Sequence, residues 1–258
     1  MTRIADRFAE LGAKGKKAFV GFVTAGDPSL ERTEEIALQM DAAGVDVLEL
    51  GVPFSDPLAD GPVIQRSSER ALRSGTTLGA ILELVGRIRR RSRMPLLLFS
   101  YVNPLLRYGV ERLVAEARAA GADGVLVTDL PPEEADSWLA AARGGGLDTV
   151  FLAAPTSPDA RLRSVAASST GFVYAVTRTG VTGEQGILSP EAEPLVARLK
   201  GMTRTPVAVG FGISTPEQVA AAASVADGVV VGSALVRFLE EHPSGDVGER
   251  VRWLKSGI

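Results

Sequence analysis

Eight short apolar runs alternate with helix-like segments along this chain of 258 residues, and this alternation limits its possible folds more than any other feature. The runs are rich in Val, Leu and Phe, and they begin at Lys17, Val45, Met94, Ala122, Asp148, Gly171, Thr205 and Ala226. Their nearly continuous apolar character is typical of parallel strands that are buried on both faces. Eight strand–helix units favour a closed (β/α)8 barrel, the TIM barrel, over an open sheet, which could also hold eight strands.

The segments between the runs have helical spacing and helix-capping residues. Residues 29–44 place apolar side chains on one face, with Ser29 as the N-cap and Gly44 as the carboxyl-terminal stop. Further helices are expected at residues 109–121, 131–146 and 214–225, the last capped by Ser214 or Thr215. We expect a single domain over residues 1–258, closed by a packing helix near the carboxyl terminus.

Two units and the amino terminus depart from the regular pattern. The unit from Val45 to Met94 is about twice the usual length, which predicts an inserted loop with its own helix after the second strand. Another long gap follows the sixth strand, and long loops of this kind lie at the carboxyl-terminal rim of a barrel, where active sites are built. Residues 1–15 carry Ile4, Phe8 and Leu11 on one side, which predicts an amino-terminal helix covering the barrel bottom.

Charge and composition exclude several classes of function. A formal net charge of −3 argues against nucleic acid or an anionic membrane as the main partner. The chain has no cysteine, so it has neither disulfides nor thiolate chemistry, and its single histidine, His242, lies in a polar stretch that predicts a surface position. No signal peptide or long apolar span is found, so we expect a cytoplasmic protein. Because the sequence lacks a cluster of metal-ligating residues, we also expect no metal site.

Glycine-rich turns at the last strands predict a phosphate site. The turns contain Gly183, Gly212, Gly232 and Ser233, whose amides could bind three phosphate oxygens. Each glycine alone could merely relieve a tight turn, but three such turns at one rim favour an anion site.

One carboxylate lies within the second apolar run and two more follow it in the next loop, without a nearby Lys or Arg. Glu49 lies within the apolar run, where loss of hydration would raise its pKa and suit it to proton exchange near neutral pH. A structural carboxylate bonded to backbone amides is the alternative for Glu49. Asp60 precedes Gly61 and could instead be an N-cap, and Asp56 could be a turn former or an interface residue.

Acid–base chemistry on a small phosphorylated molecule is the resulting interpretation. No metal-ligand cluster is found, and no lysine stands at the inner end of a strand for a Schiff base, since Lys17 opens the first strand at the opposite end of the barrel. The catalytic groups are therefore expected to be carboxylates, hydroxyls and backbone amides.

Several segments, taken in order, resemble the signature segments of the tryptophan synthase alpha chain family. They are FVTAGDP, LELGVPFSDPLADGPVIQ, YVNPLLRYG, DGVLVTDLP, TRTGVTG, VGFGIS and DGVVVGSALV, within a similarity that runs from about Phe8 to Val236. The resemblance implies a lyase that cleaves indole-3-glycerol phosphate to indole and glyceraldehyde 3-phosphate in tryptophan biosynthesis.

Residue roles also follow from this resemblance. Glu49 matches the family's general acid–base residue, and Asp60 matches the carboxylate that holds the indole N–H. Thr182 matches the residue that meets Asp60 when the loop after the sixth strand closes. The side chains expected to sandwich the indole are those of Phe22, Ile64, Phe99, Leu126 and Tyr174, any of which could instead be plain barrel core.

The resemblance further implies a partner. The family works with a beta chain, as an alpha2-beta2 heterotetramer, and pyridoxal phosphate is expected only in that beta chain, so this chain is expected to need no cofactor. Asp56, Pro57 and Asn103 match positions that face the beta chain.

The sequence departs from the family pattern at one position, and it allows three alternative functions. Glu184 stands where family members carry a small residue, beside Gly183, and a negative charge there would oppose anion binding if it pointed inward. The alternatives are a stand-alone lyase that releases free indole, a non-catalytic subunit that only activates a partner, and another phosphosugar barrel such as an isomerase.

Overall fold

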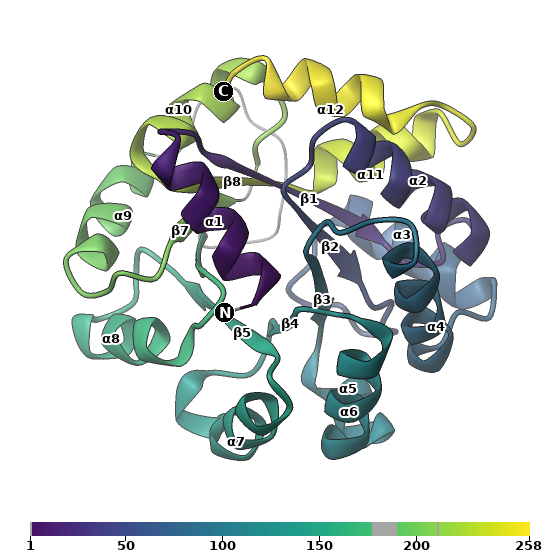
Figure 1. Cartoon of the computed structure of the whole chain (residues 1–258), viewed down its shortest axis with the longest axis horizontal. Coiled ribbons are helices and arrows are strands. Elements are labelled where there is room, and N and C mark those ends of the chain that lie inside the picture. Colours follow the sequence, from purple (N-terminus) through teal and green to yellow (C-terminus); the bar gives the residue numbers. More distant parts are fainter. Residues whose placement is uncertain (1, 177–189, 211) are drawn as a thin grey trace.

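The computed structural model describes residues 2–176, 190–210 and 212–258. Its eight strands form a closed parallel barrel in which each strand pairs with its neighbours in chain order and β8 pairs with β1 (Figure 1). The strands are β1 (Ala18–Thr24), β2 (Val47–Gly51), β3 (Leu96–Ser100), β4 (Gly124–Val127), β5 (Asp148–Ala153), β6 (Val173–Val176), β7 (Val207–Gly210) and β8 (Gly228–Val231). The predicted fold and all eight predicted strands are confirmed.

Helices surround the barrel, as Figure 1 shows. They are α1 (Arg3–Ala13), α2 (Leu30–Ala42), α3 (Pro62–Arg73), α4 (Leu78–Arg89), α5 (Val102–Tyr108), α6 (Val110–Ala120), the 3-10 helix η1 (Pro132–Glu134), α7 (Asp136–Gly145), α8 (Asp159–Ser168), α9 (Ala192–Lys200), α10 (Pro216–Val225), α11 (Ser233–Glu241) and α12 (Val247–Lys255). The inserted helix predicted after the second strand is α3, and the predicted final helix is α12.

Local capping explains where several of these helices begin. The Ser29 side chain accepts a hydrogen bond from the Arg32 amide at the start of α2. The Thr215 hydroxyl caps α10 by accepting a hydrogen bond from the Gln218 amide. The Gln218 side chain accepts one from the Thr215 amide, which completes a capping box. The sequence therefore predicted these two helix starts correctly, and the structure selects Thr215 over Ser214 as the cap of α10.

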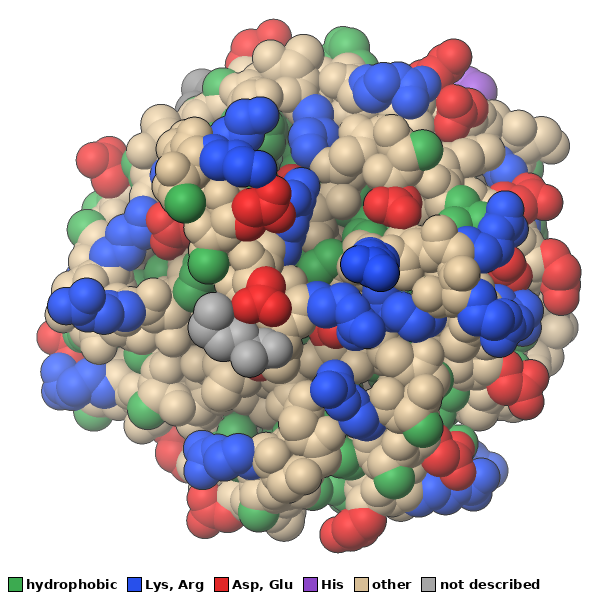
Figure 2. Space-filling view, viewed as in Figure 1, with side chains coloured by type: hydrophobic (Ala, Val, Ile, Leu, Met, Phe, Trp, Pro, Cys, Tyr) green, Lys and Arg blue, Asp and Glu red, His purple; other side chains and the backbone are tan. Residues whose placement is uncertain are grey.

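The amino-terminal helix α1 packs against the amino end of the barrel, as predicted. Ile4, Phe8 and Leu11 are buried in the apolar cluster that fills the barrel interior, with the Phe8 and Phe172 ring centroids 5.6 Å apart. Ion pairs hold the helix in place, since Arg3 binds the buried Asp123 at 2.7 Å. Figure 2 shows this face of the molecule, on which basic and acidic side chains are interspersed.

Two apolar layers stabilise the barrel. The larger one lies between the strands and the surrounding helices, and the smaller one fills the barrel interior. Over the described ranges 2–176, 190–210 and 212–258, no helix combines the length and the apolar character needed to cross a bilayer. The interior layer ends beneath a pocket at the carboxyl ends of the strands.

Candidate active site

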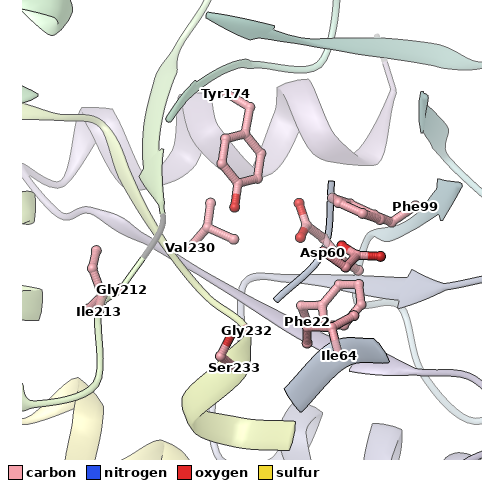
Figure 3. Close-up of a pocket in the computed structure, with 11 residues that line it drawn as sticks. Phe22, Asp60, Ile64, Phe99, Tyr174, Gly212, Ile213, Val230, Gly232 and Ser233 are labelled. Carbon is pink, nitrogen blue, oxygen red and sulfur yellow. The ribbon is translucent and has the colours of Figure 1, made fainter. Parts of the chain in front are cut away.

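A pocket that is partly open to solvent lies at the carboxyl end of the barrel (Figure 3). Its lining residues come from β1, β2, β3, β6 and β8, from the loop before α3, from the starts of α3 and α11, and from the turn after β7. They are Phe22, Glu49, Asp60, Ile64, Phe99, Tyr174, Gly212, Ile213, Val230, Gly232 and Ser233. A concave site lined mainly by apolar side chains, with a few polar groups among them, suits a small-molecule ligand. The pocket thus brings together nine residues that the sequence analysis singled out.

Glu49 lies in the middle of β2 and points into this pocket. Its side chain is almost fully buried, with 1% of its surface exposed, and its Oε1 atom has no hydrogen-bond partner among the described residues. Burial away from water raises the pKa of Glu49 from its ordinary 4.5 to about 8. The carboxyl is therefore mostly protonated at neutral pH, which makes it a proton donor with an atom free to reach a ligand.

Asp60 lies in the loop between β2 and α3 and is half-buried. The N-cap of α3 is Gly61, which makes no side-chain capping bond, so Asp60 is not the helix cap that the sequence also allowed. Burial raises the pKa of Asp60 to about 6, and a hydrogen bond from Tyr101 lowers it in part. At neutral pH Asp60 is therefore mostly ionised, whereas Glu49 is mostly protonated.

Tyr101, which the sequence analysis missed, fixes the loop that carries Asp60. Its hydroxyl donates to the Asp60 carboxylate and accepts a hydrogen bond of 3.0 Å from the Ala59 amide. The centroids of the Phe54 and Tyr101 rings lie 5.2 Å apart, so Tyr101 makes a second contact with the same loop. The sequence did hold a signal for Tyr101. This residue comes immediately after the third strand, and so it lies at the same rim of the barrel as Glu49.

Apolar side chains form walls of the pocket that the two carboxyl groups share. The Phe22 and Phe99 rings meet edge to face, with centroids 5.2 Å apart, and Ile64 packs with them. Gly51 leaves room for this arrangement, because a Cβ atom there would stand 2.5 Å from the Phe22 ring. The walls can therefore take a flat aromatic group.

Tyr174 presents its hydroxyl to the pocket, as Figure 3 shows. Burial raises the pKa of this hydroxyl well above its ordinary value, and the nearby Glu49 and Asp60 raise it further. The phenol therefore stays neutral and can donate a hydrogen bond. Ile213 and Val230 also line the pocket, and the sequence analysis did not single them out.

Leu126 is not brought into the pocket. It is fully buried in the barrel interior, in the same cluster as Leu97 and Val150, and it is absent from the pocket lining. In the barrel it pairs with Phe99 of β3 and Val150 of β5, and its side chain packs in the interior cluster and not against the pocket. The structure thus assigns this side chain to the core, which was the alternative in the sequence analysis.

The glycine turns lie at the other end of the pocket. Gly212 follows β7 with φ of +81°, a conformation that favours glycine, and Gly232 precedes Ser233, the first residue of α11. The first N–H groups of a helix have no partner within the helix and carry partial positive charge, so they suit an anion. Three other positions of the sequence analysis, Thr182, Gly183 and Glu184, lie outside the described residues.

The residues expected at a partner interface lie outside this pocket. Asp56 and Asn103 are exposed, and Pro57 is half-buried beside Asp56. Leu58 is 87% exposed and Leu106 61% exposed, so the rim loop and α5 present apolar side chains to solvent. In the described part of the chain, no group of three or more His, Cys, Asp or Glu side chains is placed to hold a metal ion.

Comparisons with known proteins agree with this geometry. The family model described as the tryptophan synthase alpha chain matches residues 8–254. A tryptophan synthase alpha chain from Citrifermentans bemidjiense is 51% identical, with 100% of this chain and 98% of the relative covered, and one from Solibacter usitatus is 54% identical over 94% and 91%. A tryptophan synthase structure from Mycobacterium tuberculosis superimposes with a TM-score of 0.93 at 37% identity, covering 100% of this chain and 98% of that one.

Proposed function

The chain belongs to the tryptophan synthase alpha chain family, a family of lyases that act on indole-3-glycerol phosphate, and from this membership we propose how its own residues perform the cleavage. One observation carries the proposal. Two buried or half-buried carboxyl groups with raised pKa values, Glu49 and Asp60, share one pocket with the glycine turns at Gly212 and Gly232.

Glu49 acts first as an acid and then as a base. Its protonated carboxyl gives a proton to C3 of the indole, which leaves a positively charged indoleninium ring. The resulting carboxylate then takes the proton of the C3′ hydroxyl while the C3–C3′ bond breaks. The electrons of that bond return to the ring to form indole, the glycerol fragment leaves as glyceraldehyde 3-phosphate, and Glu49 is protonated again.

Asp60 stabilises the charged intermediate. Its carboxylate, ionised at neutral pH, accepts a hydrogen bond from the indole N–H as the ring becomes positively charged. None of the pocket-lining residues in the described part of the chain is a Lys or Arg, so no cation competes with the ring for this carboxylate. Tyr101 keeps the Asp60 loop in position.

The remaining pocket residues hold the two ends of the substrate. Phe22, Ile64, Phe99 and Tyr174 enclose the indole, while amides at Gly212, Gly232 and Ser233 bind the phosphate. We also assign roles to two positions outside the described residues, with Thr182 closing over Asp60 and Gly183 adding an amide to the phosphate site. Binding both ends places the C3–C3′ bond beside Glu49.

A steady-state assay with indole-3-glycerol phosphate tests these roles. We expect Glu49→Gln and Asp60→Asn each to lower kcat by at least about a hundredfold, the scale of a positioned acid–base group. Asp136→Asn is the control, because Asp136 is an exposed carboxylate at the start of α7, outside the pocket. Full cleavage by Glu49→Gln would refute the assignment and revive the alternative of a non-catalytic subunit.

We further propose that the exposed rim binds a tryptophan synthase beta chain in the cytoplasm, as an alpha2-beta2 heterotetramer. The exposed Asp56, Asn103 and Leu58, together with Pro57, support this surface, and the pyridoxal phosphate of the beta chain would be the only cofactor of the complex. Co-purification with a beta chain tests the proposal, and Leu58→Asp should reduce it while Asp136→Asn should not. Rapid cleavage without any beta chain, and no binding of one, would favour the stand-alone lyase instead.

A further inference from the structure

Two helices begin at opposite ends of the substrate pocket and are joined on their solvent-facing side by charged residues. Helix α3 starts directly after the Asp60 loop, and α11 starts at the phosphate turn with Ser233. Further along the two helices, Arg66 and Arg70 of α3 and Glu240 of α11 form ion pairs that also include Asp27 from the loop after β1. We name these four side chains the Glu240 cluster.

Glu240 is the centre of this cluster. Its two carboxylate oxygens accept hydrogen bonds from Arg66 Nε at 2.9 Å and Nη2 at 2.7 Å, and Oε1 also accepts one from Arg70 Nη1 at 2.7 Å. Arg70 in turn binds both oxygens of Asp27, in the loop after β1, at 2.8 and 2.7 Å. Each arginine uses its fork of N–H groups, which gives these pairs a defined geometry.

The position of Glu240 on its own helix is electrostatically unfavourable without these partners. It lies in the last turn of α11, where the negative end of the helix dipole opposes a carboxylate. The hydrogen bonds from Arg66 and Arg70 nevertheless lower the pKa of Glu240 to about 2, so it stays ionised at any physiological pH. The pairing with α3, and not its own helix, therefore explains why a carboxylate is stable at this position.

Between the Glu240 cluster and the pocket, the two helices share a small apolar core. Val63 and Ile64 of α3, Val236 of α11 and Phe22 of β1 are all buried in it, with Phe99 packed against them. Ile64 and Phe22 also line the pocket, and Figure 3 shows them beside Gly232 and Ser233. A shift of α11 relative to α3 would therefore move the phosphate turn relative to the indole walls.

We propose that Glu240 is a positioning residue that sets the distance between the indole end and the phosphate end of the pocket. The inference rests on the function proposed above, since it assumes a ligand that spans both ends. It predicts a selective defect. A ligand that contacts both ends loses affinity when the cluster is broken, whereas ligands that contact only one end do not.

Binding measurements on paired variants test this inference. In a Glu49→Gln background, which prevents turnover, Glu240→Gln should weaken binding of indole-3-glycerol phosphate about tenfold, which in free energy is half of the roughly hundredfold cost of a misplacement of about 1 Å. Binding of indole alone and of inorganic phosphate alone should stay within about twofold. In the protein with Glu49 intact, kcat/KM should fall by a similar factor.

The chain offers a matched control at Glu34. This residue of α2 also bridges two arginines, accepting from Arg87 Nε in α4 at 2.8 Å and from Arg91 Nη1, just after α4, at 3.5 Å, and it lies outside the pocket. Its side chain is 19% exposed and that of Glu240 26%, so Glu34→Gln removes a carboxylate bridge of similar exposure that lies away from the pocket. Glu34→Gln should change the affinity for indole-3-glycerol phosphate, the ligand that spans both ends of the pocket, by less than twofold.

The possible results distinguish a positioning role of Glu240 from general damage to the fold. Equal effects of Glu240→Gln and Glu34→Gln, or an equal loss of affinity for the spanning ligand and both single-end ligands, would overturn the proposal, because either result indicates general damage. If Glu240→Gln fails to fold, Arg70→Lys keeps the charge and removes the fork, and the same selective defect is expected. Failure of the proposed function would show instead as absence of cleavage by the unaltered protein.

Discussion

Replacing Glu49 by glutamine should stabilise this protein at alkaline pH while it removes the cleavage activity. The carboxyl is almost fully buried, and its Oε1 atom has no hydrogen-bond partner among the described residues. Ionising such a group is costly, because the charge is separated from water without compensation. Glutamine has nearly the same shape and never ionises.

The size and pH dependence of the effect follow from the pKa. The folded protein raises the pKa of Glu49 from 4.5 to about 8, and at about 1.4 kcal/mol per pKa unit ionisation costs roughly 5 kcal/mol of folding free energy. The folded state binds the proton more tightly than the unfolded state, so the cost is absent below pH 4.5, grows as the pH rises, and is complete above pH 8. At pH 7 it amounts to about 3 kcal/mol.

Urea unfolding of both proteins at pH 5 and pH 8 measures this cost. The free energy of unfolding of Glu49→Gln, minus that of the unaltered protein, should increase by about 3.5 kcal/mol between the two pH values. Effects of packing cancel in this comparison, because they do not depend on pH, and Asp136→Asn should show no such increase. A difference that stays constant with pH would refute the raised pKa and with it the acid role of Glu49.

Further predictions concern the neighbours of Glu49. The pH profile of kcat/KM should be bell-shaped, with an acidic limb near pH 6 where Asp60 ionises and an alkaline limb near pH 8 where Glu49 loses its proton. Tyr101→Phe should move the acidic limb to higher pH, because it removes a hydrogen bond that lowers the pKa of Asp60; an unchanged limb would contradict that contact. Gly212→Ala should weaken binding of inorganic phosphate and cost about 1–2 kcal/mol in urea unfolding, since φ is +81°. Gly51→Ala should raise KM through displacement of the Phe22 ring, and a KM equal to that of the unaltered protein would refute this close contact.

Local patterns in the sequence determined the course of the chain. The eight apolar runs predicted the strands, Ser29 and the pair Ser214–Thr215 predicted helix starts, and the double-length unit after the second run predicted the inserted α3. These features depend on burial period and on capping within a few residues, which can be read without knowledge of distant contacts. Glu49 was identified in the same way, as a charge within an apolar run.

Only the tertiary structure decided which distant residues meet. Tyr101 reaches the loop of Asp60 from the next strand, and Glu240 reaches Arg66 across 174 positions of the chain, pairings that neither local segment specifies. Leu126 shows the same limit, because a strand pattern predicts that a side chain points inward but not how far up the barrel it lies. Depth in the barrel and pairing between helices arise from strand tilt and side-chain packing over the whole molecule, and they set the pKa values on which the chemistry depends.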